Sequence, residues 1–291
     1  MARAWRRRAS EVRAQGLEAF RLIHGAADGL AGLEIEAYAG SWLATLESED
    51  WIRAMPALEK ALSEVQASIF PKRSGRCHFV ANLPERREVL GSVEVETLQV
   101  AEDGLRFEVG LGQGPHSGLF LDQRENRRET RRLASGRRCL NLFCYTGSFS
   151  IAALAGGAAE VVSVDLSKKA LAWLDRNRAE DAWDFLAKAA KRGERFDLIL
   201  LDPPSFGRGP KRSFNLSRDF ENLAASAAGL LSPQGDLLVS LNLESLGIAE
   251  FRRRLKLALK NFGRSPSRER PLPFDFPPSP GREPHLKSAW V

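Results

Sequence analysis

The chain is poor in cysteine, in histidine and in long apolar runs. Its 291 residues include three cysteines and four histidines. Cys77, Cys139 and Cys144 cannot form an even disulfide framework, and their spacing with the histidines matches no zinc-binding pattern. These scarcities argue against a disulfide-stapled secreted scaffold and against a metal centre. We therefore expect a reduced, metal-free, cytoplasmic protein.

No apolar run approaches the roughly 18 residues that a transmembrane helix needs. The opening residues, MARAWRRRAS, lack the hydrophobic segment that follows the charges of a secretion signal. We therefore expect no membrane partner. Basic residues outnumber acidic ones by 43 to 37, a net charge of +6, and this mild excess agrees with a polyanionic partner without demanding one.

What is present, in the middle of the chain, is a predicted strand, tight turn and helix. Cys139 to Tyr145 is an apolar run too short for a helix, and Thr146-Gly147-Ser148 ends it, which predicts a buried parallel strand that meets a turn. A ligand can approach the backbone at Gly147. Ser148 can cap a helix that Gly156-Gly157 stops.

A second predicted strand, Glu160 to Leu166, carries an acidic residue near its end. Asp165 lies eighteen positions beyond Gly147, where a carboxylate can accept both ribose hydroxyls of a bound nucleoside. Dinucleotide-binding enzymes carry an acidic residue at a similar distance. The spacing therefore indicates a nucleotide cofactor without choosing which one.

Two further features favour S-adenosylmethionine over a dinucleotide. The turn has one glycine followed by bulky Phe149 and lacks the G-x-G-x-x-G that a pyrophosphate requires. After the predicted strand Phe196 to Leu201 comes DPPSF, whose prolines hold a rigid turn with free carbonyls. Phe206, the last residue of this turn, offers a flat face on which a base can stack.

Four motifs stand in order along the chain: GLFLDQRENR from Gly118, NLFCYTGSFS from Asn141, VDLS from Val164 and FDLILLDPPSF from Phe196. Together they resemble the class I S-adenosylmethionine-dependent methyltransferases of large-subunit (23S) ribosomal RNA, of the cytosine-C5 and guanine-N7 type. EAFRLIHGAADGLAGLEIEAY from Glu18 is similar to the opening of the small domain that precedes the catalytic domain in those enzymes. The resemblance thus covers nearly the whole chain.

The resemblance implies S-adenosyl-L-methionine as cofactor and RNA as partner. We expect the protein to be a monomer or homodimer. It also implies that FLDQR lies against the cofactor, with Asp122, Gln123 and Arg124 at its amino-acid end. The alternative interpretation of this arginine-rich segment is an amphipathic docking helix. The cofactor-binding residues predicted from all these motifs are Phe120, Asp122, Gln123, Arg124, Asn141, Phe143, Tyr145, Thr146, Gly147, Ser148, Asp165, Leu166, Ser167, Asp181 and Asp202.

We expect two domains: a small α+β domain at residues 1–115 and an S-adenosylmethionine-binding catalytic domain at 116–291. The resemblance gives the second domain a Rossmann-like α/β fold with a mostly parallel, seven-stranded sheet. The elements predicted in the first domain are a hairpin of Gly32–Tyr38 with Ser41–Leu46, a helix over Trp51–Ala67, and a hairpin of Val93–Val100 with Leu105–Leu111. Those predicted late in the second are a helix over Phe220–Leu231, a turn at Ser232–Gly235, a strand over Asp236–Leu241, a helix over Ile248–Phe262, a long ordered loop and an edge strand over His285–Val291.

Ala2 to Glu18 is predicted to be a helix with arginines spread around it. These arginines form either a solvated helix face or an arm that follows phosphates. The resembled family usually carries an additional RNA-binding (PUA) domain upstream, which is missing here, and the arginines would partly substitute for it. The arginines concerned are Arg3, Arg6, Arg7, Arg8 and Arg13.

The segment after Asn177 departs from the resembled pattern. Related sequences interpose a strand before the acidic residue that meets the adenine, whereas here Asn177-Arg178 passes directly to Asp181. Either that strand is shortened or residues are absent from the sequence. Asp181 matches the adenine-binding position only loosely.

The residue after the strand Asp236 to Leu241 bears on the methylated atom. Carbon 5 of cytosine reacts after a thiolate adds to carbon 6, and the cytosine-modifying members of the resembled family place that cysteine here. This chain has Asn242, as the guanine-N7 members do, and Cys144, which sequence alone leaves open, is not well placed to attack a base. We predict direct transfer to a ring nitrogen, with guanine N7 favoured. The predicted catalytic residues are Asp202, Pro203, Pro204, Phe206 and Asn242.

Other functions also fit the sequence. A methyltransferase acting on DNA or a small molecule would explain the missing upstream domain. A cytosine-C5 rRNA methyltransferase would use Cys144. A cofactor-binding protein that recognises RNA without catalysis would explain the shortened segment after Asn177.

Overall fold

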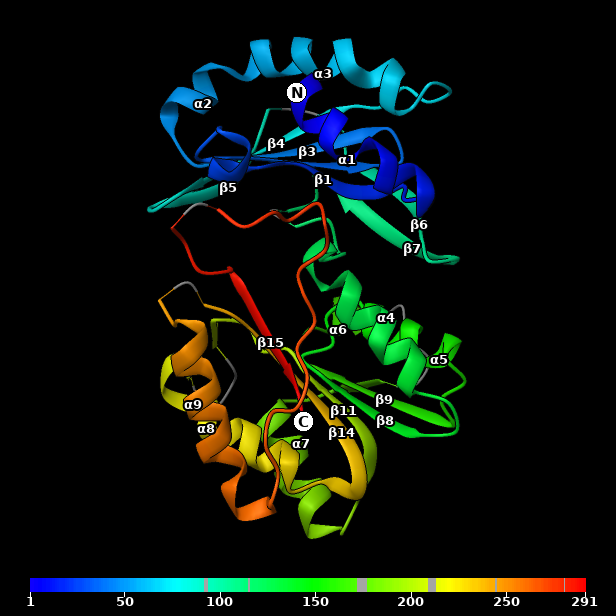
Figure 1. The fold of residues 1–291 in the computed structure, drawn as a ribbon, viewed down its shortest axis with the longest axis vertical. Helices are drawn as coiled ribbons and strands as arrows, with labels where there is room; N and C mark the ends of the chain where they lie inside the picture. The colour runs from blue at the N-terminus through cyan, green and yellow to red at the C-terminus, as the bar shows by residue number, and fades with distance from the viewer. Residues whose placement is uncertain (92–93, 115, 172–176, 209–212, 244, 280) are drawn as a thin grey trace. The chain divides into compact units, whose positions relative to one another are not determined.

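The computed structural model describes residues 1–91, 94–114, 116–171, 177–208, 213–243, 245–279 and 281–291. The chain forms two compact units (Figure 1). The first holds Met1–Arg124 with Leu272–Arg282, and the second holds Glu125–Pro271 with Glu283–Val291. The sequence prediction, with its boundary near residue 115, did not anticipate that a segment close to the C-terminus belongs to the first unit.

The first unit is built on a five-stranded sheet of order β1-β2-β3-β4-β5, with a separate ribbon of β6 and β7. Its helices and strands are α1 (Ala2–Ala14), β1 (Ala19–His24), η1 (Gly25–Asp28), β2 (Leu33–Tyr38), β3 (Ser41–Leu46), α2 (Glu49–Arg53), α3 (Met55–Ile69), β4 (Cys77–Leu83), β5 (Arg86–Leu90), β6 (Glu96–Glu102), β7 (Leu105–Leu111) and η2 (Leu121–Gln123). Helices α1 and α3 bury Trp5 and Leu62 against sheet residues such as Phe20. One apolar core therefore holds this unit together.

Both hairpins predicted in the first unit are present. Strands β2 and β3 pair antiparallel up to Tyr38 and Ser41, and β6 pairs antiparallel with β7. The β6–β7 turn has left-handed backbone at Asp103 (φ 53°) and Gly104 (φ 75°), as a two-residue hairpin loop demands. The predicted single helix over Trp51–Ala67 was wrong, because α2 ends at Arg53 and a second helix, α3, starts with a proline in its first turn.

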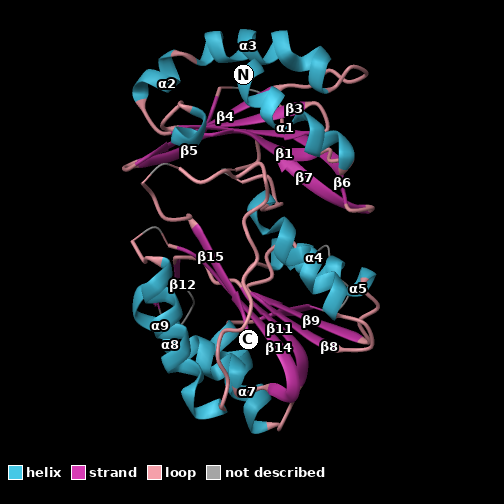
Figure 2. Ribbon diagram, in the orientation of Figure 1, coloured by secondary structure: helices cyan, strands magenta, loops and turns pink. Residues whose placement is uncertain are grey.

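The second unit contains a six-stranded sheet of order β10-β9-β8-β11-β14-β15 among the described residues, and its helices and strands are coloured in Figure 2. Its elements are α4 (Arg124–Leu133, whose first residue belongs to the first unit), β8 (Arg138–Leu142), α5 (Ser148–Ala155), β9 (Glu160–Asp165), α6 (Lys168–Leu171), β10 (Asn177–Ala179), α7 (Ala182–Lys191), β11 (Phe196–Leu201), β12 (Phe206–Arg208), β13 (Ser213–Asn215), α8 (Leu216–Ala228), β14 (Leu231–Asn242), α9 (Ile248–Leu259), η3 (Lys260–Phe262) and β15 (Leu286–Trp290).

Every strand pair in this sheet is parallel except β14 with β15. The predicted Rossmann-like, mostly parallel α/β domain and its closing edge strand are thus confirmed, with six described strands in place of the expected seven. The turn predicted at Ser232–Gly235 was wrong. These residues lie inside β14, where the register against β11 shifts between Phe196 and Leu198.

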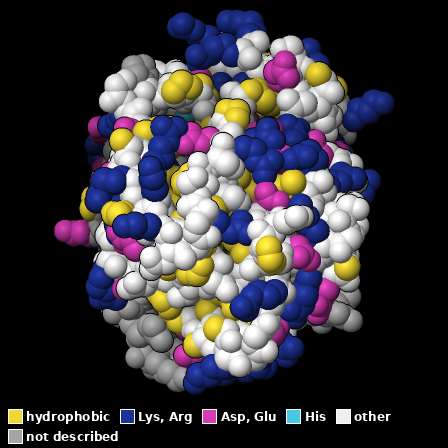
Figure 3. Space-filling model, turned by 60° about the horizontal axis from the view of Figure 1, so that its bottom comes forward, with side chains coloured by type: hydrophobic (Ala, Val, Ile, Leu, Met, Phe, Trp, Pro, Cys, Tyr) yellow, Lys and Arg dark blue, Asp and Glu magenta, His cyan; other side chains and the backbone are white. Residues whose placement is uncertain are grey.

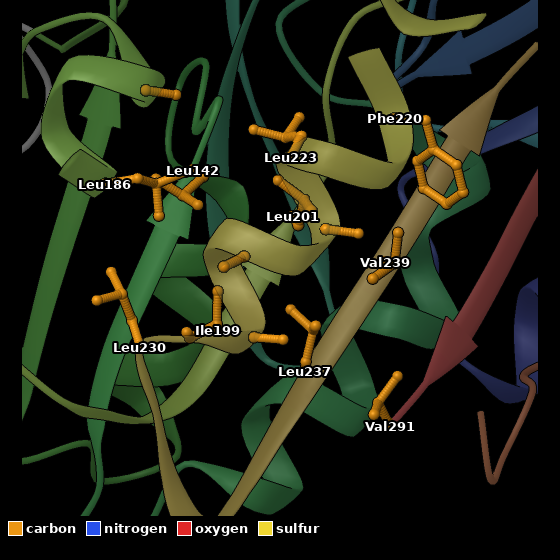
Figure 4. Packing of buried hydrophobic residues seen from close by; sticks show 14 of the residues in the cluster. Leu142, Leu186, Ile199, Leu201, Phe220, Leu223, Leu230, Leu237, Val239 and Val291 are labelled. Atoms are coloured by element: carbon orange, nitrogen blue, oxygen red, sulfur yellow. The ribbon is translucent and has the colours of Figure 1, made fainter. Parts of the chain in front are cut away.

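Helices cover both faces of this sheet, which explains why its strands read as continuous apolar runs. In β11, Leu198 and Leu200 pack with residues of α5, whereas Ile199 and Leu201 pack with residues of α7, α8 and α9. Figure 4 shows the packing on the face covered by α7, α8 and α9, where side chains of β11 and β14 lie against Leu223 of α8. No helix in the described residues is both long and apolar enough to cross a lipid bilayer.

Candidate cofactor and substrate site

The strand order of the second unit marks where a ligand can bind. From β8 the chain passes through α5 to β9 on one side, and after β10 it returns through α7 to β11 on the other side of β8. The direction of winding therefore reverses between β8 and β11. In open parallel sheets, ligands bind outside the carboxyl ends of the strands at such a switch point.

The loop that follows β8 has an unusual backbone. Phe143 (φ 57°) and Tyr145 (φ 49°) lie in the left-handed region although neither is glycine, and Gly147 has φ 84°. Left-handed backbone at bulky residues is sparsely populated and occurs where the surrounding structure holds it, often at binding sites. The predicted strand Cys139–Tyr145 therefore ends at Leu142. The predicted cap at Ser148 was wrong, because Gly147 occupies the N-cap of α5 and no side chain caps it.

Asp165, at the end of β9, fixes this loop. One carboxylate oxygen accepts a hydrogen bond from the Tyr145 backbone N–H at 2.9 Å, and the other accepts from the Ser167 N–H at 2.8 Å. Each carboxylate oxygen has a second lone pair for a further donor. The side chain is thus oriented by the two neighbouring loops, as a group that binds a ribose needs to be.

A buried polar chain connects the strands behind this loop. The Asn141 amide nitrogen of β8 donates to Ser150 of α5 at 2.9 Å, and Ser150 shares a 2.7 Å hydrogen bond with Ser163 of β9. The Asn141 side-chain oxygen is buried and has no partner within the described residues. Buried acceptors without a partner are uncommon. A hydrogen-bond donor of a ligand bound at the β8 loop could satisfy this one.

The turn after β11 presents the predicted substrate residues. The Asp202 carboxylate accepts a 2.6 Å hydrogen bond from the Ser240 hydroxyl of β14. Pro203 is buried, Pro204 is exposed, and Phe206 is 69% exposed, the highest exposure among the large apolar side chains described. An exposed aromatic ring after a rigid proline turn can stack on a planar base.

The same turn is attached to the end of β14. The Ser205 hydroxyl donates to the main-chain carbonyl of Asn242, and Asn242 itself is exposed. The next carbonyl, of Leu243, accepts a 3.0 Å hydrogen bond from the ammonium of Lys287, which is 1% exposed on β15. The ring of Phe143 lies 5.8 Å from that of Phe214 in β13. The loops after β8, β11 and β14 are therefore joined by contacts of the second unit itself.

Neither cysteine of this region suits a nucleophilic role. Burial raises the pKa of the Cys144 thiol far above its ordinary value, and the negative charge of Asp165 raises it further. Burial also raises the pKa of Cys139 to about 12. Both thiols are buried and stay protonated at neutral pH, whereas attack on a base requires a thiolate.

Asp181, predicted to meet the adenine, is engaged locally. Its carboxylate accepts from the N–H groups of Trp183 and Asp184 and caps α7. The strand before it exists in shortened form as β10, which pairs with β9. Residues 172–176, which belong to the segment in doubt, lie outside the described residues.

Four predicted cofactor residues, Phe120, Asp122, Gln123 and Arg124, belong to the first unit. Their contact with a cofactor stays a prediction. Arg124 is fully buried, and its guanidinium donates to Asp275 at 2.7 Å, to Glu102 at 3.2 Å and to the carbonyl of Ala19 at 3.0 Å. The structure therefore gives Arg124 a part in holding together the first unit.

The remaining predicted residues, Thr146, Leu166 and Ser167, lie in the loops after β8 and β9. Sequence reasoning did not assign roles to Ser205, Ser240 or Lys287, which tie the substrate turn to β14 and β15. Serine and lysine are common surface residues, so their presence alone predicts no role. Of the three, only Ser240 had a feature that could have indicated one, because it lies within a predicted strand. In the described part of the chain, no group of three or more histidine, cysteine, aspartate or glutamate residues could hold a metal ion.

The second unit has the α/β architecture of proteins whose ligands bind at the carboxyl ends of parallel strands. The profile of the S-adenosylmethionine-dependent methyltransferase family matches residues 20–254. The chain belongs to this family. The predicted enzyme class and its cofactor, S-adenosylmethionine, are thereby confirmed, and the residues after β8 and β9 fit that cofactor.

Two relatives carry names that state a substrate. A ribosomal RNA large subunit methyltransferase of Deinococcus radiodurans is 32% identical over 269 residues, which are 85% of this chain and 65% of the relative. Ribosomal RNA large subunit methyltransferase I of Aeromonas salmonicida is 34% identical over 244 residues, which are 78% of this chain and 61% of the relative. The chain thus spans less than two thirds of the length of either relative.

Solved structures show the same fold. A protein described provisionally as a methyltransferase and complexed with SAH is 27% identical, with a TM-score of 0.84 over 99% of this chain and 78% of its own. A SAM-dependent methyltransferase from Agrobacterium tumefaciens is 22% identical, with a TM-score of 0.64 over 83% of this chain and 78% of its own. The second likeness bears on the fold alone.

Proposed function

We propose that this protein methylates a base of large-subunit (23S) ribosomal RNA. The names of relatives that are 32% and 34% identical support the substrate class. The structural observation that carries the proposal is the turn after β11, in which the 69% exposed ring of Phe206 follows a proline turn that Ser205 attaches to Asn242. A stacking ring next to a polar side chain suits a planar base with hydrogen-bonding edges.

The residues of the β8 and β9 loops would hold the cofactor, which supplies an electrophilic methyl group on its sulfonium. Asp165 has a lone pair left on each oxygen after binding Tyr145 and Ser167, and these would accept the ribose hydroxyls. Asn141 offers a buried acceptor next to the same loop. These groups are fixed before binding, so the protein contributes orientation at little further entropic cost.

For the target, Phe206 would stack on the base and Asn242 would contact its edge. An asparagine amide provides both a donor and an acceptor, which orient a base without covalent chemistry. Guanine N7 carries a lone pair and no proton, so alignment with the methyl group suffices. We therefore propose direct transfer to a ring nitrogen, with guanine N7 favoured, and the protonated, buried thiols of Cys139 and Cys144 are consistent with it.

Nucleoside mass spectrometry of ribosomal RNA tests the proposal. We expect 23S rRNA from a deletion strain to lack one methylated guanosine, and the purified protein with S-adenosylmethionine to restore it. A matched protein carrying Asp165→Ala serves as the negative control. Intact rRNA modification in the deletion strain, together with methylation of DNA or a small molecule by the purified protein, would rule the rRNA assignment out.

A further inference from the structure

Helix α1 divides its arginines between two faces. Ala4, Trp5, Arg8 and Val12 are buried, at the spacing of one helical face. The side chains of Arg3, Arg6, Arg7 and Arg13 are exposed. At about 100° per residue, Arg3, Arg6 and Arg13 fall within roughly 80° of one another around the helix axis. The sequence suggested arginines spread around the helix, whereas in the structure four of the five face outward and Arg8 faces the core.

Two of these arginines anchor the helix to its own unit. Arg8 donates to both carboxylate oxygens of Asp28, at 3.0 and 2.7 Å, and to the carbonyl of Asp275. Arg7 also pairs with Asp28. Burial alone would raise the pKa of Asp28, but the hydrogen bonds from Arg8 and the His24 backbone N–H, together with the charges of Arg8 and Arg7, outweigh burial and lower the pKa. Asp28 is thus a carboxylate that binds two arginines.

The outward arginines differ from most others in this chain. Arg3, Arg6 and Arg13 have no carboxylate partner among the described residues, and the guanidinium of Arg13 lies 5.4 Å from the centre of the Trp5 ring. Many exposed arginines elsewhere are paired with carboxylates, for example Arg252 with Glu269 and Arg253 with Glu250. On the face shown in Figure 3, Lys and Arg side chains form several separate groups with acidic ones between them. Positive charge alone therefore does not identify a binding surface for a polyanion. A row of arginines without carboxylate partners, on a helix anchored to its own unit, does.

We propose that the outward face of α1, defined by Arg3, Arg6 and Arg13, binds the phosphate backbone of the RNA substrate. This inference rests on the proposed function. From residue 3 to residue 13 the helix rises about 15 Å, enough to face several phosphates of one strand. Arginine forks match phosphate oxygens, and an arginine without an internal carboxylate has its donors available to them. The contact would be independent of base sequence.

The salt dependence of RNA binding tests this surface. The probe is transcribed 23S rRNA, and the dissociation constant is measured over a range of potassium chloride concentrations. Each lost phosphate contact lowers the slope of log affinity against log salt by about 0.7 to 0.9. The combined variant Arg3→Gln, Arg6→Gln, Arg13→Gln should lower it by about 2. The double variant Arg3→Gln, Arg6→Gln leaves the Trp5 contact intact and should lower it by about 1.5.

A charge-matched control separates local contact from net charge. The combined variant Arg192→Gln, Arg252→Gln, Arg253→Gln also removes three positive charges. It removes them from exposed arginines that pair with Glu194, Glu269 and Glu250. Its slope should stay close to that of the wild type. Equal losses in both triple variants, or no loss in the α1 variants, would overturn the proposal. If the wild type methylates rRNA while the α1 variants keep its slope, this inference alone fails. A wild type that leaves rRNA unmodified refutes the proposed function instead.

Discussion

The hydroxyl of Ser205 donates a hydrogen bond to the main-chain carbonyl of Asn242, across 37 positions of sequence. It connects the turn that presents Phe206 to the residue that we expect to contact the edge of the target base. We predict that Ser205→Ala lowers kcat for RNA while cofactor affinity is unchanged. A neutral hydrogen bond contributes about 0.5 to 1.5 kcal/mol, so the loss should be roughly threefold to tenfold. Steady-state kinetics with isothermal titration of S-adenosylmethionine would show this, and Ser226→Ala, on the exposed side of α8, provides the control.

Asp165 should be required for cofactor affinity. Removing a carboxylate that accepts the ribose hydroxyls costs about 1.5 to 3 kcal/mol, so Asp165→Ala should weaken the binding of S-adenosylmethionine by roughly tenfold or more. Isothermal titration measures it. A circular dichroism melt should accompany the titration, because the carboxylate also binds the N–H groups of Tyr145 and Ser167. A change below about threefold would remove Asp165 from the site.

Phe206 should act on RNA and not on the cofactor. Stacking of one base on an aromatic ring contributes about 1 to 3 kcal/mol. Phe206→Ala should raise the dissociation constant for the RNA accordingly and leave cofactor affinity nearly unchanged. Phe206→Trp keeps a stacking face and should retain most of the binding. Loss of cofactor binding in a folded Phe206→Ala protein would mean that the turn serves the cofactor.

The reaction should proceed without a covalent link between enzyme and RNA. The pKa of Cys144 is raised, so its reactive thiolate forms only as the pH rises well above the ordinary value for a thiol. Alkylation of Cys144 by iodoacetamide should therefore be slow at pH 8 in the native protein and fast after unfolding.

Cys144→Ser should accordingly keep most of the turnover, and Asn242→Ala should lower it. RNA carrying 5-fluorocytosine should give no trapped adduct on a denaturing gel. An adduct that disappears in the Cys144→Ser protein would return the enzyme to the cytosine-C5 class.

Asp275 should be important for the stability of the first unit. It binds the fully buried guanidinium of Arg124 at 2.7 Å and accepts the Arg21 backbone N–H at 2.8 Å. Removing one partner of a buried ion pair costs up to about 3 to 5 kcal/mol when the other charge is left alone. Here Glu102 still pairs with Arg124 at 3.2 Å and offsets part of that loss. Asp275→Ala should lower the urea midpoint strongly. Glu269→Gln, which breaks an exposed pair with Arg252, should change the free energy of unfolding by less than about 1 kcal/mol.

The sequence alone was sufficient for the catalytic fold and for much of the candidate site. Buried parallel strands leave continuous apolar runs such as FDLILL, and the residues that follow them must lie at one edge of the sheet. For this reason the loops containing Gly147, Asp165 and Asp202 could be located from local pattern. The hairpin at Asp103-Gly104 could also be predicted, because its turn needs left-handed backbone and the Asp-Gly pair that adopts it is visible in the local sequence.

Only the tertiary structure decided which distant side chains meet. Asp275 pairs with Arg124 across 151 positions, so a segment near the C-terminus completes the first unit. Arg8 turned out to be an internal anchor while Arg3 and Arg6 face outward. Side-chain periodicity tells which residues share a face, but not which carboxylate will lie opposite a given guanidinium. That choice depends on how the elements pack, because burying a charge is tolerated only where a partner from elsewhere in the chain compensates it.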